Sequence, residues 1–448
     1  MRSLALLVLL TCVAGCSRSN GNWARGQAPA TRIPPSSGLT GAWDWNGIIG
    51  TGQSLSVGAE ARELRATAAS YDNLKLDLGS RFFPASEPDS RSLSLVPLRE
   101  PIRPLAGGYP SPYPRNIYGE TPHTAMASQL SAAVMSAASG ARFVTIHSVV
   151  GESGQALQVI AKGAARAPDR GHAYEASLFE ARAITRLAKL EGRSYGVGAI
   201  VLTHGEADAG SPTYAAGLRQ FLADYDADLR AITGQKQTPL LLLTQQSSEP
   251  SRPGAQAGSA LAALSASEAG EIVCVGPRYQ YTYAADGVHL DALSYDRLGE
   301  KYGQVYFERV VRGRPWRPLG PLGLVREAGF VRVDFHVPVA PLVWDEQLPD
   351  ADARFRPEWA AGKGFELSQG ERPVRIDSVE IVGSSVRVHH APGLVGPLTV
   401  RYAASAQSGA RPRGTRRWGR LRDSDPFVGA LTGLPQPNHA VVFEVTLP

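Results

Sequence analysis

Residues 199–208 read AIVLTHGEAD, and this stretch indicates the class of fold. A short apolar run ends at Thr203 and a polar loop follows at once, as at the end of a strand that is buried on both faces. Similar apolar runs lie at residues 48–49, 143–150, 240–244 and 272–275, and amphipathic helical stripes lie at residues 178–188, 218–229 and 298–305. Strands that alternate with helices predict an α/β fold with a parallel sheet between two layers of helices.

The period changes after the proline-rich residues 314–321. Apolar and polar side chains alternate over residues 331–337 and 398–402, which is the period of half-buried strands, and residues 374–388 add more strand material. We therefore expect an α/β domain over residues 39–317 and an all-β sandwich domain over residues 322–448.

The N-terminus predicts an export signal over residues 1–15, because Arg2 precedes a short apolar run and small residues follow it. That run is too short to cross a bilayer as a mature helix. Val13-Ala14-Gly15-Cys16 resembles a bacterial lipobox, which implies cleavage before Cys16 and lipid attachment to it; ordinary secretory cleavage is the alternative.

Residues 16–38 have no apolar period and are expected to form a tether behind the lipid. Since Ser17 rather than an acidic residue follows Cys16, the resemblance implies a lipid-anchored protein of the bacterial cell envelope, at the outer membrane and facing the periplasm or the exterior. The membrane is thus one expected partner, held through Cys16.

The composition bears on the size of the core, on nucleic acid partners and on disulfide bonds. The chain has 448 residues, of which 43% are hydrophobic and 19% charged, enough for sizeable cores. The net charge of +5 comes from scattered arginines without a basic stripe and interleaved aromatics, so no nucleic acid partner is expected. Of the three cysteines only Cys274 lies in the body of the chain, in an apolar run, and we expect it to be a buried core residue without a disulfide partner.

Three short motifs carry the chemistry: Gly52-Gln53-Ser54, the His204 to Asp208 loop, and Asp286-Gly287-Val288-His289. Each follows a predicted strand, so all three should meet at the carboxyl edge of the sheet. Ser54 needs an adjacent base to act as a nucleophile, and His289 serves that purpose with Asp286 to hold its imidazole. Each motif alone is weak evidence; their order and setting favour acyl transfer.

These motifs resemble the blocks of the SGNH hydrolase superfamily, and most of all its sialate O-acetylesterase and carbohydrate acetylesterase branch. That branch has Gly-Gln-Ser in its first block, a Gln-Gly-Glu sequence with a following aspartate in its third, and Asp-x-x-His in its last. The resemblance covers residues 39–311. It implies a flavodoxin-like three-layer α/β/α domain, a Ser54-His289-Asp286 triad, no metal or other cofactor, and an acylated carbohydrate as substrate.

The resemblance also implies an oxyanion hole. In the family it combines the N–H of the nucleophile, here Ser54, with a glycine N–H from the second block and a side chain from the third. Gly151 and Gly154 both follow the strand at residues 143–150, and the sequence does not choose between them. His204 stands where the branch has glutamine, and a neutral imidazole donates one hydrogen bond in its place.

Glu206 and Asp208 allow a second interpretation, as the paired acid and base of a glycosidase. We favour a loop-supporting role, in which the two carboxylates accept backbone N–H bonds. His389 and His390 are adjacent in a predicted strand and point to opposite faces, so no metal site is predicted there.

The sequence therefore predicts a lipid-anchored serine esterase that removes acetyl or other short acyl groups from a carbohydrate. A lipase or thioesterase of the same superfamily is the enzymatic alternative, and a surface glycan-binding lipoprotein without catalysis is the alternative from another class. Residues 107–114, rich in aromatics and proline, are a candidate lining of the pocket.

Overall fold

The structure is a computed structural model that describes residues 43–77, 93–102, 119–167, 170–247, 258–267, 270–348, 361–404 and 417–448. The export signal, Cys16, the tether and the loop at residues 107–114 lie outside these ranges. In the described ranges, no helix combines the length and the apolar character that a membrane crossing requires.

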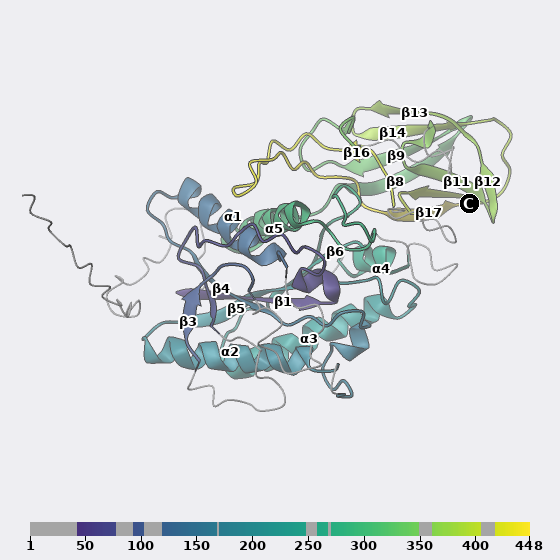
Figure 1. The fold of residues 1–448 in the computed structure, drawn as a ribbon. Coiled ribbons are helices and arrows are strands. Elements are labelled where there is room, and N and C mark those ends of the chain that lie inside the picture. Colours follow the sequence, from purple (N-terminus) through teal and green to yellow (C-terminus); the bar gives the residue numbers. More distant parts are fainter. Residues whose placement is uncertain are drawn as a thin grey trace, which may run out of the picture.

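A seven-stranded sheet forms the centre of the first domain (Figure 1). Its order is β3-β2-β4-β1-β5-β6-β7, and only the edge strand β3 runs antiparallel. Counted as first to fifth, the strands β1, β4, β5, β6 and β7 lie in the order 2-1-3-4-5, the doubly wound order of flavodoxin. The bounds are β1 Trp45–Gly52, β2 Leu74–Leu76, β3 Leu95–Pro97, β4 Val144–Val149, β5 Tyr195–Thr203, β6 Leu240–Thr244 and β7 Ile272–Gly276.

Helices cover both faces of this sheet, which confirms the predicted α/β class (Figure 1). The helices α2 (Ala173–Leu190) and α3 (Tyr214–Thr233) pack on one face, while α1 (Pro122–Ala137) and α5 (Ala292–Tyr306) pack on the other. The shorter α4 (Gly258–Ala266) lies beside α3, and one π-helical turn, Phe307–Val311, ends α5. Cys274 is buried in the core as predicted, and burial raises the pKa of its thiol to about 12.

The second domain contains two four-stranded antiparallel sheets, β12-β11-β15-β17 and β13-β14-β9-β8, as the period-two pattern predicts, and a two-stranded sheet of β10 and β16. Phe335 of one sheet packs 6.4 Å from Phe365 and 6.0 Å from Phe443 of the other, between ring centroids, so the core lies between the sheets. The bounds are β8 Gly320–Glu327, β9 Phe330–His336, β10 Val343–Trp344, β11 Phe365–Gln369, β12 Arg372–Val374, β13 Ile376–Val382, β14 Ser385–His390, β15 Leu398–Tyr402, β16 Leu421–Arg422 and β17 Phe443–Leu447.

The two domains share buried residues along their seam. Tyr279, which follows β7, belongs to the core of the sandwich, and Val441 belongs to the core of the α/β domain. Gln245 after β6 accepts a hydrogen bond from the backbone N–H of Val442 at 2.7 Å and donates to the Val442 carbonyl at 2.9 Å. The sandwich is therefore packed against the loops that follow the parallel strands, where the predicted site lies.

Candidate functional site

The turn after β1 presents Ser54. Gly52 has φ of +135° and a Cβ there would lie 2.3 Å from the Thr203 carbonyl oxygen of β5, so only glycine fits. Ser54 then opens the 3-10 turn η2 (Ser54–Val57), and the backbone oxygen of Ser54 accepts the N–H of Ala59. The Gly52-Gln53-Ser54 motif thus leaves the sheet at the carboxyl edge of the central strand.

His289 and Asp286 reach the same place from the loop between β7 and α5. The imidazole Nε2 of His289 lies 2.7 Å from Ser54 Oγ, and its Nδ1 lies 2.5 Å from Asp286 Oδ2. The other oxygen of Asp286 accepts the backbone N–H groups of Val288 at 2.9 Å and His289 at 3.0 Å. The structure therefore brings the three residues of the predicted triad into one hydrogen-bonded chain.

The bonding pattern assigns the protons. A carboxylate only accepts, so Nδ1 of His289 carries the hydrogen toward Asp286, and Nε2 presents its lone pair to the Ser54 hydroxyl. Partial burial raises the pKa of the Asp286 carboxyl, but the hydrogen bonds from the His289 side chain and the two backbone N–H groups outweigh that effect and lower it below its usual value. Asp286 is therefore ionised at neutral pH.

The two candidate oxyanion glycines lie in different settings. Gly151 is buried against the turn that bears Ser54, since a Cβ there would lie 1.8 Å from Ser56 Oγ and 2.9 Å from the Gly52 carbonyl oxygen. Gly154 is exposed at a turn, with φ of +70° and nothing within 4 Å of the position that a Cβ would take. Gly151 is the one in contact with the loop that bears Ser54.

The geometry of His204 is at odds with the oxyanion role predicted for it. Nε2 of His204 lies 3.0 Å from the Gln155 carbonyl oxygen, and Nδ1 lies 2.9 Å from the Tyr214 hydroxyl. The carbonyl accepts the only hydrogen of a neutral ring, and burial lowers the pKa of His204, so the neutral form is the stable one. Both ring nitrogens are thus committed inside the protein, and no N–H is left for a substrate.

Glu206 and Asp208 have partners of the kind a loop support needs. Oε1 of Glu206 lies 2.5 Å from a guanidinium nitrogen of Arg278, and Oδ2 of Asp208 accepts the backbone N–H of Leu157 at 2.7 Å. Asp208 thus accepts a backbone N–H bond as predicted, whereas Glu206 pairs with an arginine side chain; neither contact is that of a free acid or base. In the described ranges no group of three or more His, Cys, Asp or Glu side chains is arranged to hold a metal ion.

Two residues at the site had no role assigned from the sequence, although Gln53 belongs to the Gly52-Gln53-Ser54 motif. Gln53 Oε1 accepts the backbone N–H of Ala207 at 3.2 Å, which joins the turn of Ser54 to the His204–Asp208 loop. Arg278 is buried after β7, and besides its pair with Glu206 it donates from Nε to the Gln245 carbonyl at 3.2 Å. An arginine three residues beyond the apolar run at residues 272–275 is the only signal that the sequence offers for it.

No protein-family model matches the chain, and no curated protein matches it at a significant level. A solved structure does. A carbohydrate acetylesterase from Xanthomonas citri superposes with a TM-score of 0.53 at 14% identity, over 89% of this chain and 80% of that one. The chain shares its fold with that esterase.

Two further solved structures overlap less of the chain. NanS gives a TM-score of 0.40 at 12% identity over 59% of this chain and 96% of that one, and a carbohydrate acetylesterase from Sinorhizobium meliloti gives 0.30 at 14% identity over 58% and 97%. The similarity to the acetylesterase branch expected from the motifs is thus confirmed as a likeness in structure, carried by the Xanthomonas citri protein.

Proposed function

We propose that this chain is a serine esterase of the SGNH hydrolase type that removes acetyl or other short acyl groups from a carbohydrate. One observation carries the proposal: the Ser54 hydroxyl, the His289 imidazole and the Asp286 carboxylate form a continuous hydrogen-bonded chain, at 2.7 Å and 2.5 Å, from two loops far apart in sequence. The carboxyl edge of a doubly wound sheet is where such a crevice belongs.

In the proposed course, Ser54 Oγ attacks the ester carbonyl carbon while its proton passes to His289 Nε2, and the carbonyl electron pair moves onto oxygen. The N–H groups of Ser54 and Gly151 are the proposed oxyanion donors. Collapse of the tetrahedral intermediate breaks the bond to the sugar oxygen, which takes the proton from Nε2. Water then attacks the acyl carbon while its proton passes to His289 Nε2; the bond to Ser54 Oγ breaks, Oγ takes the proton from Nε2, and the acid leaves.

The substrate class rests on the likeness to the Xanthomonas citri enzyme, whose name states that it is a carbohydrate acetylesterase. The overlap spans both domains of this chain, since it covers 89% of the residues. We take an acetylated carbohydrate as the substrate, and the sandwich as part of the same esterase.

We propose further that Cys16 is the lipidated N-terminus of the mature protein and that residues 16–38 tether the esterase to the outer membrane of a bacterial envelope. The support is the Val13-Ala14-Gly15-Cys16 quartet, which follows a short apolar run of export-signal type.

Ser54→Ala tests the proposed chemistry. It removes the nucleophile but only one oxygen atom from a buried turn, so we expect turnover of an aryl acetate to fall by roughly three or more orders of magnitude with the fold unchanged. Hydrolysis is followed by spectrophotometry and folding by circular dichroism. Turnover at the wild-type rate in this variant contradicts the nucleophile assignment, and glycan affinity without hydrolysis in the wild type favours a binding protein.

A further inference from the structure

A C-terminal arm, residues 423–438, leaves the sandwich and runs over α5 toward α1 (Figure 1). Glu300 of α5 is fully buried beneath it, with 0% of the residue exposed. Its carboxylate accepts the backbone N–H groups of Leu431 at 2.8 Å and Thr432 at 2.7 Å, the Thr432 hydroxyl at 2.7 Å, and the side-chain amide of Gln436. A charged acceptor with four donors is a strong attachment.

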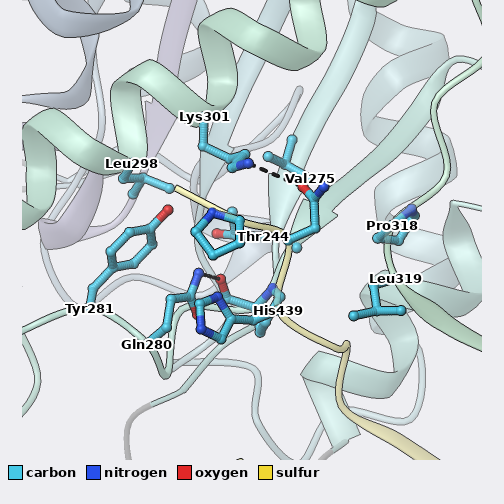
Figure 2. A pocket seen from close by; sticks show the side chains of 13 residues that line it. Thr244, Val275, Gln280, Tyr281, Leu298, Lys301, Pro318, Leu319 and His439 are labelled. Carbon is cyan, nitrogen blue, oxygen red and sulfur yellow. Dashed lines mark hydrogen bonds between the residues drawn. The ribbon is translucent and has the colours of Figure 1, made fainter. Parts of the chain in front are cut away.

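Lys301 makes a second attachment, one residue along α5. Its Nζ donates to the Gln436 carbonyl at 2.8 Å and to Asn438 Oδ1 at 3.1 Å. Burial lowers the pKa of Lys301 to about 8, against the opposing effect of Asp425 and Asp423. The ammonium group lines a cavity of about 10 Å³ at the seam, with His439 and Gln280 also on its wall (Figure 2).

The same arm also holds α1. The backbone N–H of Ala430 donates to Gln129 Oε1 of α1 at 2.8 Å. The two helices approach closely where the arm crosses them, since a Cβ at Gly303 of α5 would lie 2.8 Å from Gln129 Cβ. The arm therefore contacts both helices at one crossing.

The helix α5 leads from this crossing to both halves of the site. At its start, Ser294 Oγ accepts the N–H of Thr282 at 2.9 Å, and the N–H of Asp291 donates to the Thr282 carbonyl at 3.2 Å, which ties the helix to the loop of His289. Tyr295 OH donates to the Ala59 carbonyl at 3.3 Å, next to the turn that Ser54 opens. The helix thus contacts both the loop that bears His289 and the turn that bears Ser54.

We propose that the C-terminal arm positions the catalytic pair: by holding Glu300 and Lys301 of α5 and Gln129 of α1, it sets the separation of His289 Nε2 and Ser54 Oγ. Glu300 is a positioning residue on this account, because it touches the arm and not the substrate. The inference rests on the proposed esterase function, and it assigns the sandwich domain a part in the reaction rate.

Gly429→Ala is the test, because a Cβ at Gly429 would lie 1.8 Å from Glu300 Oε2 and so wedges the arm away from α5. Gly323→Ala in β8 is the matched control, since nothing lies within 4 Å of a Cβ there. We expect the wedge to lower kcat for an aryl acetate by about 10- to 100-fold per folded molecule with KM little changed, as a small misplacement of reacting groups does. The control keeps the wild-type kcat.

A merely structural arm gives a different result: a lower melting temperature, with wild-type kcat per folded molecule below the transition. That outcome overturns the inference while the esterase function stands. If the folded wild-type protein hydrolyses no aryl acetate, both the proposed function and this inference are wrong. Should Gly429→Ala fail to fold, Gln436→Ala removes one of the four donors to Glu300. A smaller loss of kcat in that variant supports positioning, and an unchanged kcat overturns it.

Discussion

Single residues at the site were predictable where chemistry alone limits the choice. Ser54 and His289 are 235 residues apart, yet a hydroxyl nucleophile needs a base and the base needs an orienting acceptor, so the three motifs predicted one cluster. His204 shows the limit of such reasoning, because its role depends on Gln155 and Tyr214, which no short motif reveals. The hydrogen bond of Gln53 to Ala207 is likewise a tertiary contact without a local signal.

Asp286→Asn tests the orienting role at the same scale. The neutral amide stabilises the Nδ1–H form of His289 less than the carboxylate does. It also allows the other tautomer, in which Nε2 carries the hydrogen and cannot accept the proton of Ser54. We expect kcat to fall roughly 10²- to 10⁴-fold with the fold retained. We expect a loss of kcat near the smaller end of this range, because the Asp286 side chain is 39% exposed and water in the variant can accept the hydrogen bond of the imidazole in its place. Steady-state hydrolysis of an aryl acetate measures this, and a wild-type kcat contradicts the role.

At the scale of elements, the strands and helices with a clear period were predicted and those without one were missed. The stripes at residues 178–188 and 218–229 lie in α2 and α3, and most of the charged residues between the apolar ones lie on the outer side of each helix, half-buried or exposed. Helix α1 was not predicted, because α5 and the sheet bury most of its circumference and its alanines and serines show no polar stripe. Short strands such as β2 and β3 carry too few residues for a period to appear.

Glu120, just before α1, gives the elements around the site a pH dependence. Burial, with the nearby charges of Glu100 and Asp296, raises its pKa from 4.5 to about 9. Between these values the unfolded chain releases the proton and the folded chain keeps it, so stability falls as the pH rises. Glu120→Gln keeps the shape of the protonated acid, but its side chain does not titrate in this pH range.

We therefore expect the urea midpoint of the wild type to fall relative to Glu120→Gln as the pH rises from 5 toward 9. Urea titrations of both proteins at several pH values measure the difference between their midpoints. The change of this difference with pH is the readout, because a loss of stability caused by the amide itself is the same at every pH. A difference that stays constant over this range shows that Glu120 does not bind a proton more tightly in the folded state.

At the scale of the whole molecule, the period change after residue 321 predicted an α/β part and a sandwich, and both classes of structure are present. The sequence did not predict that each domain contributes residues to the core of the other. Tyr279 joins the sandwich core and Val441 the α/β core, and such exchange depends on how the two bodies pack, which no periodicity encodes. For the same reason the C-terminal arm over α5 had no signal in the sequence.

Cys16→Ser tests where the molecule resides. Acyl chains on Cys16 would hold the mature protein at a membrane surface, and the serine variant offers no thiol for them. We expect wild-type cells fed with labelled palmitate to label the protein and to retain it in the membrane fraction, whereas the variant loses the label and becomes soluble. Retention of the variant in the membrane fraction contradicts the anchor.

The most direct test of the account is the covalent intermediate itself. The wild-type protein is mixed with an aryl acetate, quenched in acid during turnover, digested and mapped by mass spectrometry. The account predicts a single acetyl group on the peptide that contains Ser54, absent from His289→Ala treated in parallel. An acetyl group on a different residue, or hydrolysis by the wild type without any acyl-protein, contradicts it.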